Sequence, residues 1–140
     1  MKILLAVDGS SYTKKMLAYL MTHDELFGGH NDFTVVTVQP GLPPRARVAV
    51  GKEIVDSYYL EEAEKVLAPV SKFLVHHHIN AKSTWKVGPA GETIAKLADA
   101  GKFDLLVMGS HGHGALGNLV MGSVATQVLA RSKVPVLLVR

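Results

Sequence analysis

Hydrophobic residues in this chain form two patterns that alternate along its length. Short continuous apolar runs, such as the one at residues 3–7, are typical of strands buried on both faces of a parallel sheet. Between the runs, apolar residues recur at three- and four-residue steps, as on one side of an amphipathic helix. The sequence predicts strands at residues 3–7, 33–38, 81–87, 104–108 and 135–139.

Helices are predicted between these strands. Ser10 or Ser11 caps the first helix, which stops before Gly28 and Gly29. Pro69 falls within the longest helix and predicts a kink or a break there. The other predicted helices span residues 52–76, 91–100 and 123–132.

The connection at residues 39–51 lacks both patterns and contains three prolines. Proline cannot continue a helix or a central strand, so we predict an irregular loop there, the longest connection in the chain. Its two arginines, Arg45 and Arg47, are expected to be exposed to solvent rather than folded over a ligand.

Strands that alternate with helices indicate an α/β fold, an open doubly wound parallel sheet with helices on both faces. In such sheets, ligands bind beyond the carboxyl ends of the strands, at the point where strand order reverses. Asp8 and Gly109 each follow the apolar core of a predicted strand. If the first and fourth strands are neighbours, these two residues form opposite walls of one crevice.

Composition narrows the class of protein. The 140 residues, 48% hydrophobic and 19% charged, are expected to form a single domain over residues 1–140. The absence of cysteine excludes disulfides, thiol nucleophiles and thiolate metal sites. No apolar run is long enough to span a bilayer, and a strand that begins at Lys2 leaves no room for a signal peptide, so we expect a cytoplasmic protein without a membrane partner. The net charge of +3 is spread thinly, which argues against a nucleic-acid partner.

A glycine-rich loop after the fourth strand is the strongest candidate for chemistry. Glycine tolerates positive φ and has no Cβ, so backbone N–H groups in such a loop can close around a phosphate. A helix that starts near Ser123 adds unpaired N–H groups and the positive end of its dipole, and the Ser123 hydroxyl could contact a phosphate or a metal ion. The glycines have the spacing Gly109-x2-Gly112-x9-Gly122, directly before Ser123.

Two better-known nucleotide motifs do not fit this loop. Gly112 to Gly117 matches G-x-G-x-x-G, but it follows the fourth strand, and Leu137 stands where a ribose-binding acid is required. A P-loop is excluded because Asn118 and Leu119, rather than Lys and Ser or Thr, follow Gly117.

The glycine spacing, together with Asp8-Gly9-Ser10 after the first strand and the apolar run at residues 135–139, resembles the universal stress protein family in its ATP-binding branch. The similarity covers nearly the whole chain and is weakest at residues 41–51 and in the middle helix. It implies a five-stranded sheet of order 3-2-1-4-5 that holds ATP, ADP or AMP across the first and fourth strands.

The resemblance also implies contacts for individual residues. Asp8 is expected on the ribose or adenine side, the Val38 backbone against the adenine ring, and Met108 with Gly109 along the ribose. The other residues receive the phosphates, where Mg²⁺ or Mn²⁺ could bridge phosphate oxygens near Ser123 without a protein metal ligand. The implied nucleotide-binding residues are Asp8, Val38, Met108, Gly109, Gly112, His113, Gly122, Ser123 and Val124.

One departure from the family pattern concerns charge. His113 stands where many relatives carry Arg or Lys, and a neutral imidazole neutralises a phosphate less well than a permanent cation does. His111 shares the loop and could flank a phosphate together with His113. The run His76-His77-His78 is interpreted as a solvated helix end rather than a metal site, because consecutive residues point to different sides.

The motifs favour a binding protein over an enzyme. Phosphoryl transfer needs a positioned base and charge neutralisation, which the loop histidines and backbone amides supply poorly, so at most slow hydrolysis is expected. We therefore predict an ATP-binding, nucleotide-responsive stress protein. The alternative is a homodimeric interaction module of the same fold, in which the glycine loop is only a tight turn and Asp8 only caps a helix.

The last strand predicts a partner. Residues 134–139 form an apolar edge strand with no charge before Arg140, and a bare edge of this kind invites pairing with another strand. A homodimer through this edge, with the two copies antiparallel across a twofold axis, removes that liability. The alternative is a monomer with a solvated edge.

Overall fold

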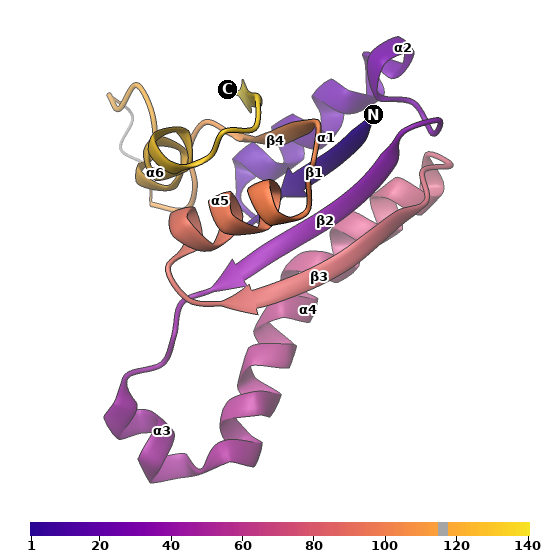
Figure 1. The fold of residues 1–140 in the computed structure, drawn as a ribbon. Coiled ribbons are helices and arrows are strands. Elements are labelled where there is room, and N and C mark those ends of the chain that lie inside the picture. The colour runs from indigo at the N-terminus through magenta and orange to yellow at the C-terminus, as the bar shows by residue number, and fades with distance from the viewer. Residues whose placement is uncertain (115–117) are drawn as a thin grey trace.

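The computed structural model describes residues 1–114 and 118–140, and its core is a five-stranded parallel sheet (Figure 1). The strands are β1 (Lys2–Ala6), β2 (Asp32–Gln39), β3 (Ala81–Val87), β4 (Leu105–Gly109) and β5 (Val136–Val139). Their order is β3-β2-β1-β4-β5, and all four pairings are parallel. This confirms the predicted fold class and the strand order that the resemblance implied.

Helices cover both faces of the sheet. They are α1 (Ser11–Met21), α2 (Asp24–Phe27), α3 (Pro44–Val50), α4 (Lys52–His76), α5 (Ala90–Ala100) and α6 (Ser123–Arg131). α1 and α4 enclose one hydrophobic cluster against the sheet, and α5 and α6 enclose a second on the opposite face (Figure 1). No helix in the described part of the chain is long and apolar enough to cross a bilayer.

The central strand β1 shows why its apolar run is continuous. Ile3 and Leu5 belong to the cluster under α1 and α4, whereas Leu4 and Ala6 belong to the cluster under α5 and α6. Successive side chains of a strand point to opposite faces, so a strand covered on both faces needs an apolar residue at every position. The end of β1, after which Asp8 follows, is therefore packed between both hydrophobic clusters.

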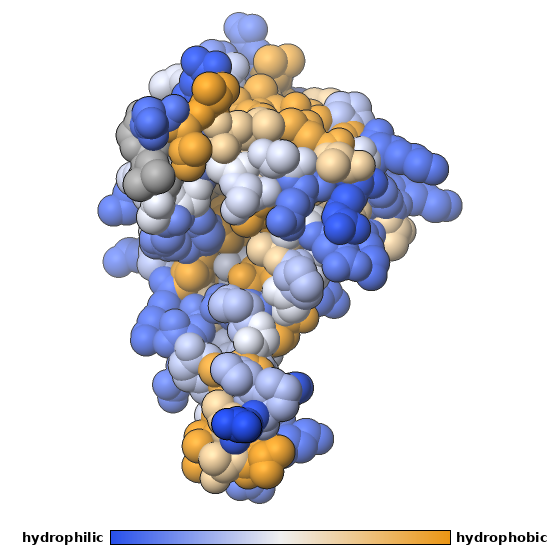
Figure 2. Space-filling model, turned by 90° about the vertical axis from the view of Figure 1, so that its left-hand side faces the viewer, coloured by the Kyte–Doolittle hydropathy of each residue, from blue (hydrophilic) through white to orange (hydrophobic). Residues whose placement is uncertain are grey.

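The prediction of an irregular loop at residues 39–51 is wrong for its second half, which forms α3. Pro44 is the first residue of α3, where the missing N–H costs no hydrogen bond and the fixed φ favours the helix. Arg45 and Arg47 are exposed, as predicted. α3 and the start of α4 extend beyond the sheet, and Figure 2 shows apolar and strongly hydrophilic side chains mixed on the surface of α3.

The long helix α4 has the predicted bounds and continues through Pro69, so the alternative of a break at this residue is wrong. Proline has no N–H, so the carbonyl group four residues before Pro69 loses its helical hydrogen bond. Pro69 is exposed, which lets water bond to this carbonyl group instead. The first helix ends earlier than the glycines alone suggested, because the His23 ring and the Thr22 hydroxyl both bond to the Tyr19 carbonyl at the end of α1.

Candidate functional site

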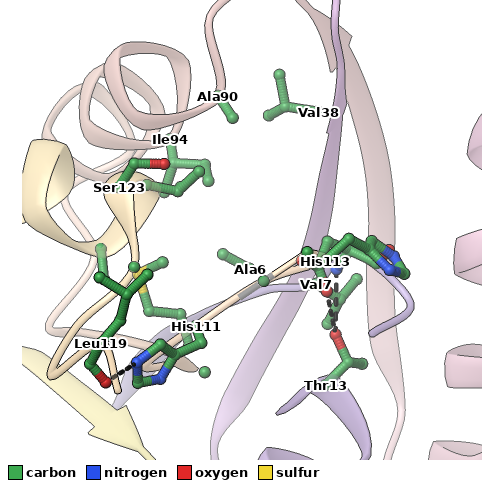
Figure 3. A pocket seen from close by; sticks show the side chains of 18 residues that line it. Ala6, Val7, Thr13, Val38, Ala90, Ile94, His111, His113, Leu119 and Ser123 are labelled. Carbon is green, nitrogen blue, oxygen red and sulfur yellow. Dashed lines mark hydrogen bonds between the residues drawn. The ribbon is translucent and has the colours of Figure 1, made fainter. Parts of the chain in front are cut away.

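A cavity opens at the carboxyl edge of the sheet, where the ends of β1, β2 and β4 meet the first turns of α5 and α6 (Figure 3). Its volume of about 300 Å³ is that of a small ligand site. Strand order reverses between β1 and β4, so the cavity lies where a doubly wound sheet binds ligands. Nine of its lining residues are those that the resemblance implied: Asp8, Val38, Met108, Gly109, Gly112, His113, Gly122, Ser123 and Val124.

One part of the cavity is apolar. Val38 from β2 lines it together with Ala90 and Ile94 from the start of α5 (Figure 3). Ala6 and Met108, which are partners in the β1–β4 register, add further apolar surface. The sequence analysis did not place Ala90 and Ile94 at the site. Ligands bind beyond the carboxyl ends of parallel strands, and the helix that follows the third strand also begins at that edge.

Asp8 is held in a fixed orientation by the start of α1. Its Oδ1 accepts hydrogen bonds from the Ser10 N–H at 2.9 Å and from the Thr13 hydroxyl at 3.0 Å. The Thr13 oxygen in turn accepts from the Asp8 N–H at 3.1 Å. The alternative that Asp8 serves the helix start is therefore correct for Oδ1, whereas no described protein group bonds to Oδ2. Thr13, which is buried and also lines the cavity, gave no signal in the sequence.

The predicted Ser10 cap takes a different form. Ser10 is the N-cap residue of α1, but its hydroxyl makes no capping hydrogen bond, and its buried oxygen has no partner in the described structure. The Asp8 carboxylate bonds to the Ser10 N–H instead. The helix start is thus stabilised by a cavity residue, which ties α1 to the site.

The glycines of the loop are required by close packing. A Cβ at Gly112 would lie 2.7 Å from Asp8 Oδ2, and a Cβ at Gly109 would lie 2.6 Å from the Tyr12 Cβ. Neither glycine has a positive φ, so the conformational reason given for them is wrong, although it holds for Gly114 at φ +71°. A side chain at Gly112 would push Asp8 away from the loop, and one at Gly109 would push α1 away from the end of β4.

The N-terminus of α6 presents free donors to the cavity. Gly122 is its N-cap and no side chain caps it. The first helical hydrogen bond runs from the Thr126 N–H to the Gly122 carbonyl, so the N–H groups of Ser123, Val124 and Ala125 lack helical acceptors. All three residues line the cavity, and the positive end of the helix dipole adds to their attraction for an anion.

The two loop histidines differ in their contacts. The His113 ring donates from Nε2 to the Asp8 carbonyl at 2.7 Å and so joins the two walls of the cavity. The His111 ring lies beside Leu119 and bonds to its carbonyl (Figure 3).

His77 bonds to the Phe73 carbonyl at an exposed helix end, as predicted for that histidine run. Among the residues that the structure describes, no three His, Cys, Asp or Glu side chains cluster as metal ligands.

Within residues 1–114 and 118–140, no Lys or Arg lines the cavity. The charged pair on α5 lies outside the lining: Glu92 contacts Lys96 at 3.0 Å. This hydrogen bond and the charge of Lys96, with a smaller contribution from Arg131, lower the pKa of Glu92. The backbone amides at the start of α6 and the Ser123 hydroxyl are therefore described donors for an anion in the cavity, whereas the Nε2–H groups of His111 and His113 are engaged by carbonyl groups.

The chain belongs to the universal stress protein family, because the family model matches residues 1–140. A universal stress protein of Thermus aquaticus is 34% identical over 138 residues, which cover 99% of this chain and 97% of that one. A universal stress protein of Synechocystis is 32% identical over 140 residues, and this chain spans 42% of its length.

Solved structures share the fold. Protein MJ0577 of Methanocaldococcus jannaschii superposes with a TM-score of 0.81 at 26% identity, over 99% of this chain and 94% of that one. A universal stress protein of Archaeoglobus fulgidus in complex with dAMP has a TM-score of 0.70 at 21% identity, over 100% and 98% of the two chains. A family member from Arabidopsis thaliana with AMP bound has a TM-score of 0.69 at 14% identity, over 99% and 91%.

The contact between Gly112 and Asp8 gives a test of the site geometry. We expect Gly112→Ala to lower the free energy of unfolding by about 1–2 kcal/mol, because the new methyl group displaces a carboxylate held by two hydrogen bonds. In an Asp8→Ala background the same change should cost little, which leaves a coupling of about 1 kcal/mol or more in a double-mutant cycle. Equilibrium unfolding in urea measures all four proteins.

Gly41→Ala is the matched control, because a Cβ there meets nothing within 4 Å. It should change stability by less than about 0.5 kcal/mol. A cost of Gly112→Ala that persists without the Asp8 carboxylate would show that something else requires this glycine.

Proposed function

We propose that this protein binds an adenine nucleotide, ATP in particular, in the cavity at the carboxyl edge of the sheet and acts in the cytoplasm as a nucleotide-responsive binding protein. The observation that carries the proposal is that the cavity combines an apolar region with polar groups of both kinds, hydrogen-bond acceptors and donors. An apolar region around Val38 and Ile94, a fixed carboxylate at Asp8 and unpaired N–H groups at Ser123 and Val124 share one space.

Each part of this cavity suits a different part of a nucleotide. The apolar region accepts a flat base, and its strand backbone offers polar groups to the edge of the base. Asp8 Oδ2 is an acceptor, which suits a hydroxyl or amino donor and repels phosphate. The start of α6 attracts the phosphates. The dAMP and AMP complexes of the two structural neighbours support an adenine nucleotide as the ligand class.

Charge balance requires that ATP bind together with a divalent cation. No Lys or Arg of the described chain lines the cavity, so Mg²⁺ or Mn²⁺ bridging phosphate oxygens near Ser123 would supply the neutralising charge. Both nitrogens of the His111 ring are engaged, Nε2 by the Leu119 carbonyl and Nδ1 by the Ser110 hydroxyl, which leaves this ring no free lone pair to act as a base for an attacking water. We therefore propose a binding function with at most slow hydrolysis.

A second candidate function has one observation in its favour. Gly109 and Gly112 are required by packing against Tyr12 and Asp8, and this requirement exists without any ligand. The loop could therefore serve an interaction module of the same fold that binds no nucleotide. Nucleotide binding to the purified protein separates the two candidates.

Two substitutions of Ser123 together isolate one backbone N–H that would donate to a phosphate, and neither disturbs the helix. It is the first residue of α6, a position that favours proline, and Gly122 before it has φ −73° and ψ 163°, which suits a following proline. Ser123→Pro removes a backbone N–H and a hydroxyl, whereas Ser123→Ala removes only the hydroxyl. We expect Ser123→Pro to weaken MgATP binding roughly tenfold more than Ser123→Ala does, because it loses a hydrogen bond to a charged group.

Calorimetry with MgATP measures this difference, and thermal unfolding of each variant without ligand confirms that α6 is intact. For the parent protein, ATP at about 100 times its Kd should add about 2.7 kcal/mol to the free energy of unfolding. Absence of binding heat at millimolar MgATP would refute the proposed function and favour the interaction module.

We also propose a homodimer through β5. On one side β5 pairs with β4, where the Leu106 N–H bonds to the Pro135 carbonyl and the Ser110 N–H bonds to the Val139 carbonyl. Hydrogen bonding alternates along a strand, so the backbone N–H groups of Val136 and Leu138 point toward the open edge. The other side of β5 has no strand in the described structure.

Val136→Pro is expected to convert this dimer to a monomer. The substitution removes an N–H that points away from β4, so the fold keeps its internal hydrogen bonds while the edge loses a donor. Val136→Ala shortens the same side chain, retains the N–H and should remain dimeric. Light scattering coupled to size-exclusion chromatography at micromolar concentration gives both masses, and a dimeric Val136→Pro would contradict pairing at this edge.

A further inference from the structure

We propose that His111 is a positioning residue of the nucleotide site, one that fixes the shape of the glycine loop before a ligand binds. The proposal rests on the proposed nucleotide function and adds to it a part of the site that none of the implied contacts includes. It concerns the phosphate end of the cavity rather than the base end.

The hydrogen bonds of the His111 ring define its role. Nε2 lies 2.9 Å from the Leu119 carbonyl, and a carbonyl only accepts, so Nε2 carries the hydrogen and donates. Nδ1 of this neutral tautomer is then an acceptor, and the Ser110 hydroxyl donates to it at 2.7 Å. One ring thereby connects the residue before it to a residue eight positions later.

Ser110 is a firm anchor for this connection. The residue is 3% exposed, its N–H donates to the Val139 carbonyl at 2.8 Å, and its carbonyl accepts from the Gly122 N–H at 2.8 Å. The two described segments of the loop, residues 110–114 and 118–122, are therefore joined twice. One link is the backbone hydrogen bond between Ser110 and Gly122, and the other is the hydrogen bond from the His111 ring to the Leu119 carbonyl. The second link is the one made by a side chain.

Packing holds the ring in this position. The centroid of the Tyr12 ring lies 4.9 Å from that of His111, and Tyr12 is itself fixed by its close approach to Gly109. Near the other end of the loop, a Cβ on Gly122 would lie 3.1 Å from the His111 Cα. The first turn of α1 therefore supports both walls of the cavity, with Thr13 holding Asp8 and Tyr12 backing His111.

A loop closed in advance costs less to order when a phosphate binds. Loss of the ring should therefore weaken the binding of ligands that carry phosphates and leave the binding of adenosine unchanged. We expect His111→Ala to reduce MgATP affinity roughly tenfold, the equivalent of about 1.4 kcal/mol. His111→Gln, whose amide can donate to the Leu119 carbonyl, should recover most of this loss, whereas the shorter His111→Asn should not.

The experiment measures MgATP and adenosine affinities by calorimetry for the parent protein and the three His111 variants. His77→Ala is the matched control, because that ring also bonds to a carbonyl, at 2.8 Å, but lies outside the cavity lining. Hydrogen exchange in the ligand-free proteins is the second readout. Amides of residues 112–114 and 118–122 should exchange faster in His111→Ala than in the parent or in His111→Gln.

A selective loss of MgATP affinity, recovery in His111→Gln and faster loop exchange support the proposal. Unchanged MgATP affinity in a folded His111→Ala protein, or equal losses for MgATP and adenosine, overturns it. If the parent protein binds no nucleotide, the proposed function fails, and the exchange data alone then decide the role of the ring: unchanged exchange in His111→Ala refutes it. Should His111→Ala fail to fold, the comparison of His111→Gln with His111→Asn provides the same test.

Discussion

The parallel pairing of β1 with β4 is the constraint on which the site depends. Ala6 lies opposite Met108 in this register, so the segments that follow both strands leave the sheet side by side. Asp8 and Gly112, more than one hundred residues apart in sequence, then come close enough that a Cβ on the glycine would meet the carboxylate. Close packing of β1 side chains in both hydrophobic clusters keeps the register fixed, because a slip by one residue would exchange side chains of different size between the two clusters.

The sequence was sufficient to predict those parts of the fold that depend on local pattern. The continuous apolar run of β1 and the apolar residues at three- and four-residue steps in α4 were visible directly in the sequence. The glycine spacing identified one wall of the cavity. The contacts of Thr13 and His111 were not visible, because they follow from how α1 packs against the loop and no local pattern encodes that packing. The prediction for α3 failed because proline breaks a helix in its interior but favours its first turn.

In the proposed function, main-chain groups meet the charge of the phosphates. An ammonium or guanidinium carries its charge wherever its side chain moves, whereas the N–H groups at the start of α6 are fixed in direction by the helix itself. Such donors need no rotamer to be ordered when an anion arrives. The accuracy of the site then depends on the residues that hold the backbone in place, which is why packing at Gly109 and Gly122 matters as much as any direct contact.

Ser110 has a consequence that reaches the far edge of the sheet. Its N–H bonds to the carbonyl of Val139, the last residue of the edge strand, while its hydroxyl and carbonyl bond to the two described segments of the loop. A single residue thus connects the edge strand to the loop and to the start of α6 by hydrogen bonds. Under thermodynamic linkage, an association event at that edge that shifts Ser110 must alter ligand affinity by the same factor by which the ligand alters the association.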